Sequence, residues 1–128
     1  MTSNYDEDYP LFTMELFGEK FDPADIPGLN DLPVQHRISP GDPRAYGKKA
    51  SETAVYEYGL LLIHSNSIRG LAQHCQTIFR SYDRQKVESV NIHVTYDGDP
   101  QGNWEFDRDE IYLLAEIGAS LSVTCDRP

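Results

Sequence analysis

The sequence lacks the short motifs that mark several common classes of enzyme and nucleotide-binding protein. It contains no HExxH, no GxSxG, no CxxC and no phosphate-cradling glycine loop. These absences remove the usual signatures of metalloproteases, serine hydrolases, dithiol oxidoreductases and P-loop nucleotide-binding proteins. We therefore expect a protein that is not an enzyme and that uses neither a metal nor a cofactor.

Long apolar runs are also missing. No stretch approaches the roughly 18 consecutive apolar residues that a membrane-spanning helix needs, and no basic start is followed by an apolar run of the signal-peptide type. We therefore expect a cytoplasmic protein that makes no membrane contact. The chain has 128 residues, enough for one domain with its own core.

Cysteine is scarce. Cys75 and Cys125 are the two cysteines, and both fall on apolar faces of the elements expected around them. This placement favours two reduced core thiols over a disulfide or a catalytic nucleophile.

Positive charge is scarce as well. The 21 acidic residues outnumber the 11 lysines and arginines, which gives a net charge of −10. Direct binding to DNA or RNA is disfavoured, because neutralisation of phosphates by cationic side chains supplies most of that affinity. The charge favours a basic protein partner; the alternative is an ordinary solvated surface behind an acidic, flexible leader at 1–10.

Hydrophobic periodicity and turn residues predict the elements of a single α+β domain over 11–128. In the first half we expect a strand over 11–17, a short helix capped by Asp22, an edge strand over 34–38 and a central strand over 55–63 buried on both faces. A long helix over 68–82, capped by Ser65 or Ser67, and a strand over 89–96 follow. The last two elements are a helix that begins with an Asp107–Glu110 capping box and ends at Gly118, and a strand that ends at Cys125. This order predicts a ferredoxin-like two-layer sandwich. Its mostly antiparallel, twisted sheet would carry two main helices on one face, with an extra C-terminal helix–strand unit.

Such a fold leaves one face of the sheet open. Polar residues alternate with apolar ones in the last two strands, and we expect the polar ones to lie on that open face. They are Ser89, Asn91, His93, Thr95, Ser120, Ser122 and Thr124. An open polar face is a natural docking surface, and the alternative is a solvated face without function.

The segment 39–53 has no periodicity and is long for a connection within a small domain. Its basic residues and an aromatic ring are suited to gripping a phosphate or carboxylate. The candidate ligand- or partner-binding residues are Arg44, Tyr46, Lys48 and Lys49 in this loop and Asn91 and His93 on the open face.

Two more specific site hypotheses have less support from the sequence. Asp97, Asp99, Gln101 and Gly102 match the first half of a calcium-binding EF-hand loop, but Arg108 stands where that loop needs its bidentate glutamate. His93 and His64 would flank a conceivable pocket, yet no partner residues for catalysis can be assigned, and a hydrogen-bonded or solvated histidine is the simpler interpretation.

Three stretches of the chain resemble the bacterial domain of unknown function 4279 family. They read FGEKFDPADI from Phe17 to Ile26, PGDPR from Pro40 to Arg44, and DRDEIYLLAEIGASLSV from Asp107 to Val123. The resemblance implies a small bacterial α+β domain, and it brings no activity and no catalytic residues with it.

Together these features predict a small cytoplasmic protein-binding domain. An immunity-type or antitoxin-like inhibitor fits best, with acidic complementarity to a basic toxin or another nucleic-acid-acting enzyme. The alternative is an anion-binding or enzymatic domain that uses 39–53 as a lid, with Arg44, Tyr46 and His93 nearest the ligand.

Overall fold

The chain folds as an α+β domain, seen here in a computed structural model that describes residues 11–44, 54–96 and 106–125. Five strands form one mixed sheet: β1 (Leu11–Gly18), β2 (Val34–Ile38), β3 (Gly59–Ser65), β4 (Ser89–Tyr96) and β5 (Ser120–Cys125). Two α-helices, α2 (Ile68–Phe79) and α3 (Arg108–Ile117), and three 3-10 turns, η1 (Pro23–Asp25), η2 (Leu29–Asp31) and η3 (Arg84–Lys86), complete the described elements. None of the described helices is long and apolar enough to cross a membrane.

The strand order across the sheet is β2-β3-β1-β4-β5. Three neighbouring pairs, β2–β3, β3–β1 and β1–β4, run antiparallel, and β4–β5 is parallel. A parallel neighbour needs a crossover connection, and α3 lies within the connection that joins β4 to β5. The expected C-terminal helix–strand unit therefore extends the sheet by one strand.

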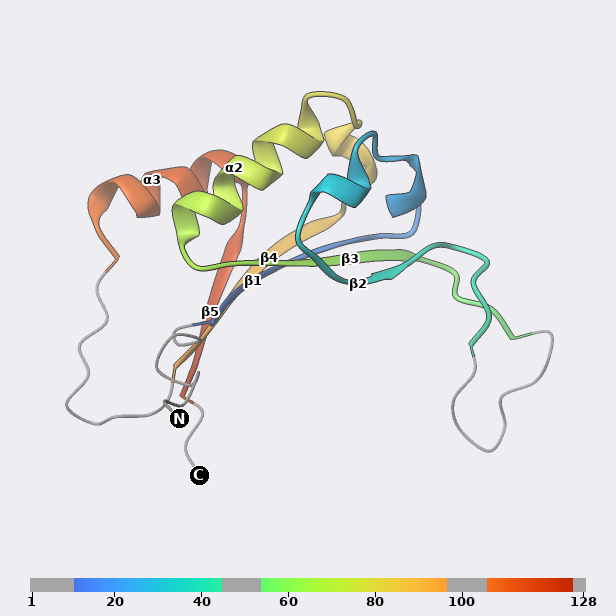
Figure 1. Cartoon of the computed structure of the whole chain (residues 1–128), viewed down its shortest axis with the longest axis horizontal. Coiled ribbons are helices and arrows are strands. Elements are labelled where there is room, and N and C mark those ends of the chain that lie inside the picture. The colour runs from blue at the N-terminus through green and yellow to red at the C-terminus, as the bar shows by residue number, and fades with distance from the viewer. Residues whose placement is uncertain (1–10, 45–53, 97–105, 126–128) are drawn as a thin grey trace.

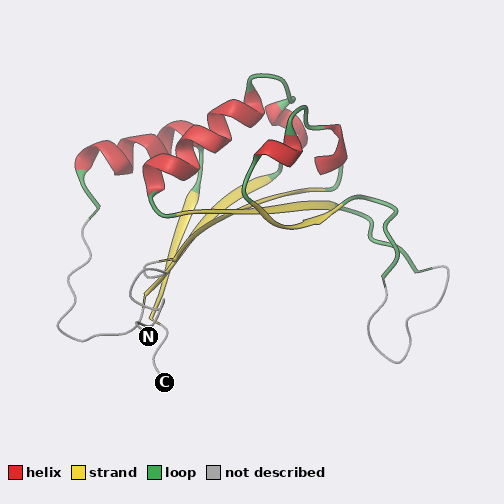
Figure 2. Cartoon of the chain, viewed as in Figure 1, coloured by secondary structure: helices red, strands yellow, loops and turns green. Residues whose placement is uncertain are grey.

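Both α-helices lie over the same face of the sheet (Figures 1 and 2). Strand residues alternate accordingly: Phe12, Met14 and Leu16 of β1 are buried, whereas the residues between them are half-buried. The amphipathic helix α2 buries Ile68, Leu71 and other apolar residues against this face. The core thus lies between the sheet and its helices.

Two glycines allow loop backbone to pack directly on the sheet. Gly18 and Gly59 are register partners at the ends of β1 and β3. A Cβ atom on Gly59 would overlap the carbonyl oxygen of Phe21, and one on Gly18 would overlap the carbonyl oxygen of Lys86. Only glycine permits these two close approaches, so this pair fixes where the connections after β1 and before β4 cross the sheet.

The ends of the α-helices follow their sequence signals. Ser67 accepts a hydrogen bond from the Gly70 N–H at the start of α2. Asp107 and Glu110 form the reciprocal capping box of α3, and Gly118 ends that helix with φ 68°. The hydrogen bond from the Glu110 N–H, followed by the charge of Arg69 at 3.0 Å, lowers the pKa of the Asp107 carboxyl.

The short helix expected after Asp22 is the 3-10 turn η1, which Asp22 caps and Pro23 begins, and a second turn, η2, follows Gly28 with φ 72°. Three other expectations from the sequence were wrong in detail. The helix expected over 68–82 ends at Phe79. The strand expected from Val55 begins at Gly59. Val55 instead forms an isolated bridge with Pro43 within the connection between β2 and β3. Leu60 and Leu62 are half-buried rather than buried, because no described helix covers their face of β3.

Candidate functional site

The side of the sheet that faces away from the helices is lined by residues that the strand register groups together, and all of them except Ile38 are half-buried or exposed. Register groups its residues into four rows running from the β2 side towards β5: Ile38, Leu60, Phe17 and Ser89; His36, Leu62, Glu15, Asn91 and Ser120; His64, Thr13, His93 and Ser122; and Leu11, Thr95 and Thr124. We call these rows the open face. All seven polar residues that the sequence predicted for this face lie in them.

The middle of the open face is polar. Thr13 lies directly between His64 and His93, and its hydroxyl donates a hydrogen bond to the His93 carbonyl oxygen at 3.4 Å. On the other side of His93, its Nε2 lies 2.8 Å from the hydroxyl of Thr124. His64 and His93 are exposed, so this row presents two imidazoles and several hydroxyls to a partner.

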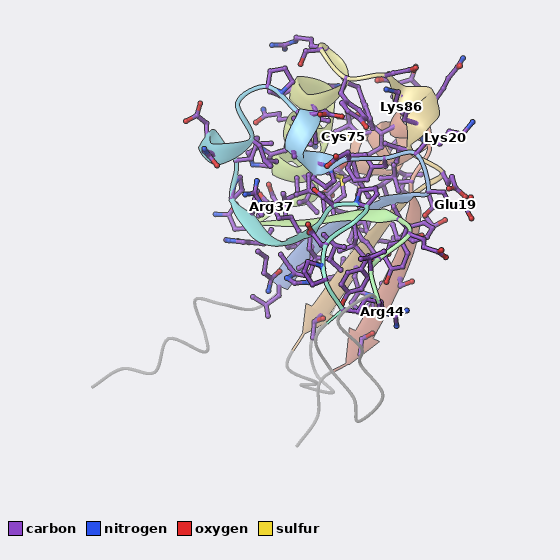
Figure 3. The ribbon with its side chains drawn as sticks, turned by 90° about the vertical axis from the view of Figure 1, so that its right-hand side faces the viewer. Glu19, Lys20, Arg37, Arg44, Cys75 and Lys86 are labelled. Carbon is purple, nitrogen blue, oxygen red and sulfur yellow. The ribbon has the colours of Figure 1, made fainter. Side chains whose placement is uncertain are left out.

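One end of the open face is aromatic. The ring of Phe17 lies 5.0 Å from that of Tyr58, which in turn lies 5.5 Å from Tyr56. The guanidinium of Arg44 stands over the Tyr56 ring at 5.4 Å. Figure 3 places Arg44 on the side of the sheet away from the helices. A cation therefore joins the aromatic end of the open face.

Charge on the open face differs from that of the chain as a whole. Glu15 is the only carboxylate in the four rows, which contain no lysine or arginine. The described residues outside it carry twelve acids, among them Asp22, Asp25 and Asp31 in and beside the 3-10 turns on the helix side. A partner would thus meet a nearly neutral face on a negatively charged molecule.

The candidate site residues are only partly brought together. Asn91 and His93 are near neighbours on the open face, as expected. Arg44 lies beyond the Phe17 row, and that row is about 13 Å along β1 from the row of Thr13 and His93. The other three candidates, Tyr46, Lys48 and Lys49, lie outside the described residues. So do the leader 1–10 and the EF-hand-like residues Asp97, Asp99, Gln101 and Gly102.

Sequence reasoning missed the aromatic end of this face. Tyr56 and Tyr58 precede β3 and alternate with Val55 and Glu57, but the sequence assigned them to a strand buried on both faces rather than to the open face. The contact of Tyr58 with Phe17 joins positions about forty residues apart in the chain, and local sequence patterns do not predict such a contact. The alternation of Thr13 and Glu15 with the buried residues of β1 was the available signal for the middle of the face.

Among the described residues, three open hollows are lined by residues outside the open face. One of about 250 Å³ is lined by Cys75, Gln76, Phe79, Arg84, Glu116 and Ile117. A second of about 330 Å³ lies beside η2 and β2, and a third of about 220 Å³ is lined by Glu19, Lys20, Gln85, Lys86 and Glu88, several of which gather at one rim in Figure 3. In the first hollow Arg84 is already engaged, donating to the carbonyl oxygens of Val87 at 2.9 Å and Ile117 at 3.3 Å.

Within the described ranges no three His, Cys, Asp or Glu side chains are grouped to hold a metal ion.

Cys75 is a fully buried thiol, and burial raises its pKa from 9.0 to about 11, partly offset by the nearby Arg84 charge. The unfolded chain ionises this thiol near pH 9, whereas the folded protein keeps it protonated. Between about pH 9 and 11 the thiol therefore costs up to about 1.4 kcal/mol of folding stability per pH unit.

Urea unfolding of wild type and Cys75→Ala across that pH range measures the effect. We expect the variant to be less stable than the wild type near neutral pH because of its small cavity. Above about pH 9 the wild type should lose stability more steeply than the variant, which lacks the titrating group. Equal slopes for the two proteins would contradict the assignment. The side chain of Cys125 lies outside the described residues.

The fold and the open face define an α+β domain with one exposed sheet surface. Comparison of the chain with protein-family models, curated proteins and solved structures found no match.

Proposed function

We propose that this chain is a small bacterial cytoplasmic protein-binding domain without chemistry of its own. It acts as an immunity-type or antitoxin-like inhibitor that docks its open face onto a basic protein. The resemblance to the domain of unknown function 4279 family supports the bacterial origin and contributes no activity.

The framework proposed for this role is a ferredoxin-like two-layer sandwich. The strand order β2-β3-β1-β4 with antiparallel neighbours supports it, as does the position of α2 between β3 and β4. In this framework η1 and η2 replace the first helix, and α3 with β5 forms an addition at the far edge.

The observation that carries the proposal is the composition of the open face. Its rows combine hydroxyls, an amide and imidazoles in the middle with Phe17, Leu60 and Leu62 towards the β2 side. Apolar anchors beside hydrogen-bonding groups on an extended surface are what protein interfaces use. A small ligand would instead favour a concave site, such as the hollows beside α2, η2 and η3, whose lining residues are not part of the four rows.

Electrostatics supports a basic partner. Net charge of −10 attracts a cationic protein over long range and speeds its encounter, while the nearly neutral open face makes the contacts without a large cost for removing charges from water. Salt screens the long-range attraction. Affinity for the partner should therefore fall as salt is raised.

A second candidate function rests on Arg44. Its guanidinium over the Tyr56 ring places a cation beside an aromatic surface at the root of the 39–53 segment, which suits a phosphate or carboxylate ligand. This candidate predicts that an anion raises the melting temperature of the wild type and not that of Arg44→Ala.

Capture of a partner by the tagged full chain from its host's lysate tests the main proposal. Thr13→Arg and Asn91→Arg place a long cation in the middle of the open face, and Gln73→Arg makes the same charge change on the exposed side of α2. We expect wild type and Gln73→Arg to retain one basic protein at low salt and to release it at high salt. Thr13→Arg and Asn91→Arg should not retain it.

Either of two results would overturn the proposal. Retention that is independent of salt would remove the electrostatic argument. Equal retention by Thr13→Arg, Asn91→Arg and Gln73→Arg would show that the partner docks away from the open face.

A further inference from the structure

The two edges of the sheet are built differently. The edge strand β2 is flanked by Pro33 and Pro40, changes register between Val34 and His36, and carries the charge of Arg37. Proline, bulges and charge are the devices by which proteins prevent an edge strand from pairing with another chain. The β2 edge is therefore protected.

The β5 edge has none of these devices. Ser120–Cys125 contains no proline and no charged residue, and it pairs with β4 without a register shift through six consecutive positions. No described residue pairs with its outer side. A regular, uncharged edge strand is a template for addition of another strand.

Apolar groups are exposed along the same edge. Leu121 and Val123 pair with the buried Ile92 and Val94, so they lie on the helix-bearing side of the sheet, yet they are 37% and 49% exposed. Ile111 of α3, the helix that leads into β5, is 56% exposed. The apolar layer of the core thus continues to the β5 edge without a described cover.

We propose that β5 pairs antiparallel with β5 of a second copy of this chain. The two-fold axis passes between the two Ser122 residues, which lie opposite each other. In this register Leu121 lies opposite Val123 of the other copy, and Ser120 lies opposite its Thr124. Apolar side chains then meet apolar ones on the helix side, and hydroxyls meet hydroxyls on the open face. Such self-complementarity is what a two-fold symmetric contact requires.

Charge limits where two copies of this chain can meet, and the β5 edge is a place where they can. Two molecules of net charge −10 repel each other wherever their acidic surfaces approach. The uncharged β5 strand lets two backbones come within pairing distance without like charges directly opposite each other. The resulting dimer has one continuous sheet of ten strands and an open face of twice the width.

Sedimentation velocity of the purified full chain over a concentration series tests the dimer in the absence of any partner, so the result is independent of the proposed function. We expect wild type to shift from 14.5 kDa to twice that mass with rising concentration. Ser122→Lys places two like charges opposite each other at the axis, on a side chain that already faces solvent, and should remain at 14.5 kDa.

The register is tested by a pair of charges. Leu121→Lys and Val123→Glu should each abolish the dimer, because each buries a charge opposite an apolar residue. The two changes in one chain should restore it, because each new lysine then faces a new glutamate of the other copy. Gln35→Lys at the β2 edge is the control and should dimerise like wild type.

A wild type that stays at 14.5 kDa at every concentration would overturn the proposal. So would a dimer that survives Ser122→Lys, or one that is abolished by Gln35→Lys. A double variant that remains monomeric while correctly folded would overturn the proposed register.

Discussion

Replacing Gly59 with alanine is expected to destabilise the fold by about 3 kcal/mol, the upper end of the usual cost of overpacking. The new methyl group would overlap the Phe21 carbonyl oxygen, and Pro23 Cδ lies 3.2 Å from the same position. Backbone cannot rotate away as a side chain can, so the segment that follows β1 must lift off the sheet. Thermal unfolding followed by circular dichroism should show a fall in melting temperature on the order of 10 °C.

Gly41→Ala is the matched control for this prediction. Gly41 has φ 93° and no atom within 4 Å of an added Cβ, so alanine there pays for an unfavourable backbone conformation and nothing else. We expect it to cost about 1 to 2 kcal/mol. A smaller loss for Gly59→Ala than for Gly41→Ala would contradict the close approach of Phe21 to β3.

Phe21→Ala is expected to cost about 3 to 5 kcal/mol of folding stability, the usual range for removing a buried phenyl ring. Phe21 is fully buried although it lies outside every strand and helix, and its ring meets Tyr82 edge-on at 5.5 Å. The Tyr82 hydroxyl also accepts a hydrogen bond from the Asp22 N–H at 3.0 Å. Losing the ring therefore removes the main anchor of the segment that leads into η1.

Chemical denaturation measures this loss, and Phe17→Ala provides the comparison. Phe17 is only half-buried on the open face, where it touches Tyr58, so its truncation leaves no enclosed cavity. We expect the midpoint to fall much further for Phe21→Ala than for Phe17→Ala. Equal midpoints would mean that the connection after β1 is not anchored to the core.

Features encoded by neighbouring residues were predictable from the sequence. The α3 capping box joins residues three apart, the stop at Gly118 needs only a left-handed residue, and the alternation in β4 marks its buried face directly. Each depends on hydrogen bonds or side-chain directions within a few residues. For these elements the sequence-based boundaries agree with the structure to within one residue.

Features set by distant partners were not predictable. The run from Leu60 to Ile63 reads as a strand buried on both sides, and only the position of the helices on one face leaves Leu60 half-buried. Likewise Leu121 and Val123 alternate as core residues do, but α3 makes its principal contacts with α2 and does not cover them. Register across the sheet, which groups the open face into rows, follows from pairings that no local pattern encodes.

The central position of β1 has a consequence for synthesis of the protein. Thr13 and His93 are 80 residues apart in the chain yet lie side by side, and β1 has no sheet neighbour on that side until β4 has been made. At the usual rates of translation this takes roughly 4 to 16 s. Both edges of β1 are free until β3 has been made, and the edge that pairs with β4 stays free for the whole interval. During synthesis Phe12, Met14 and Leu16 therefore lie on a strand that is exposed to aggregation.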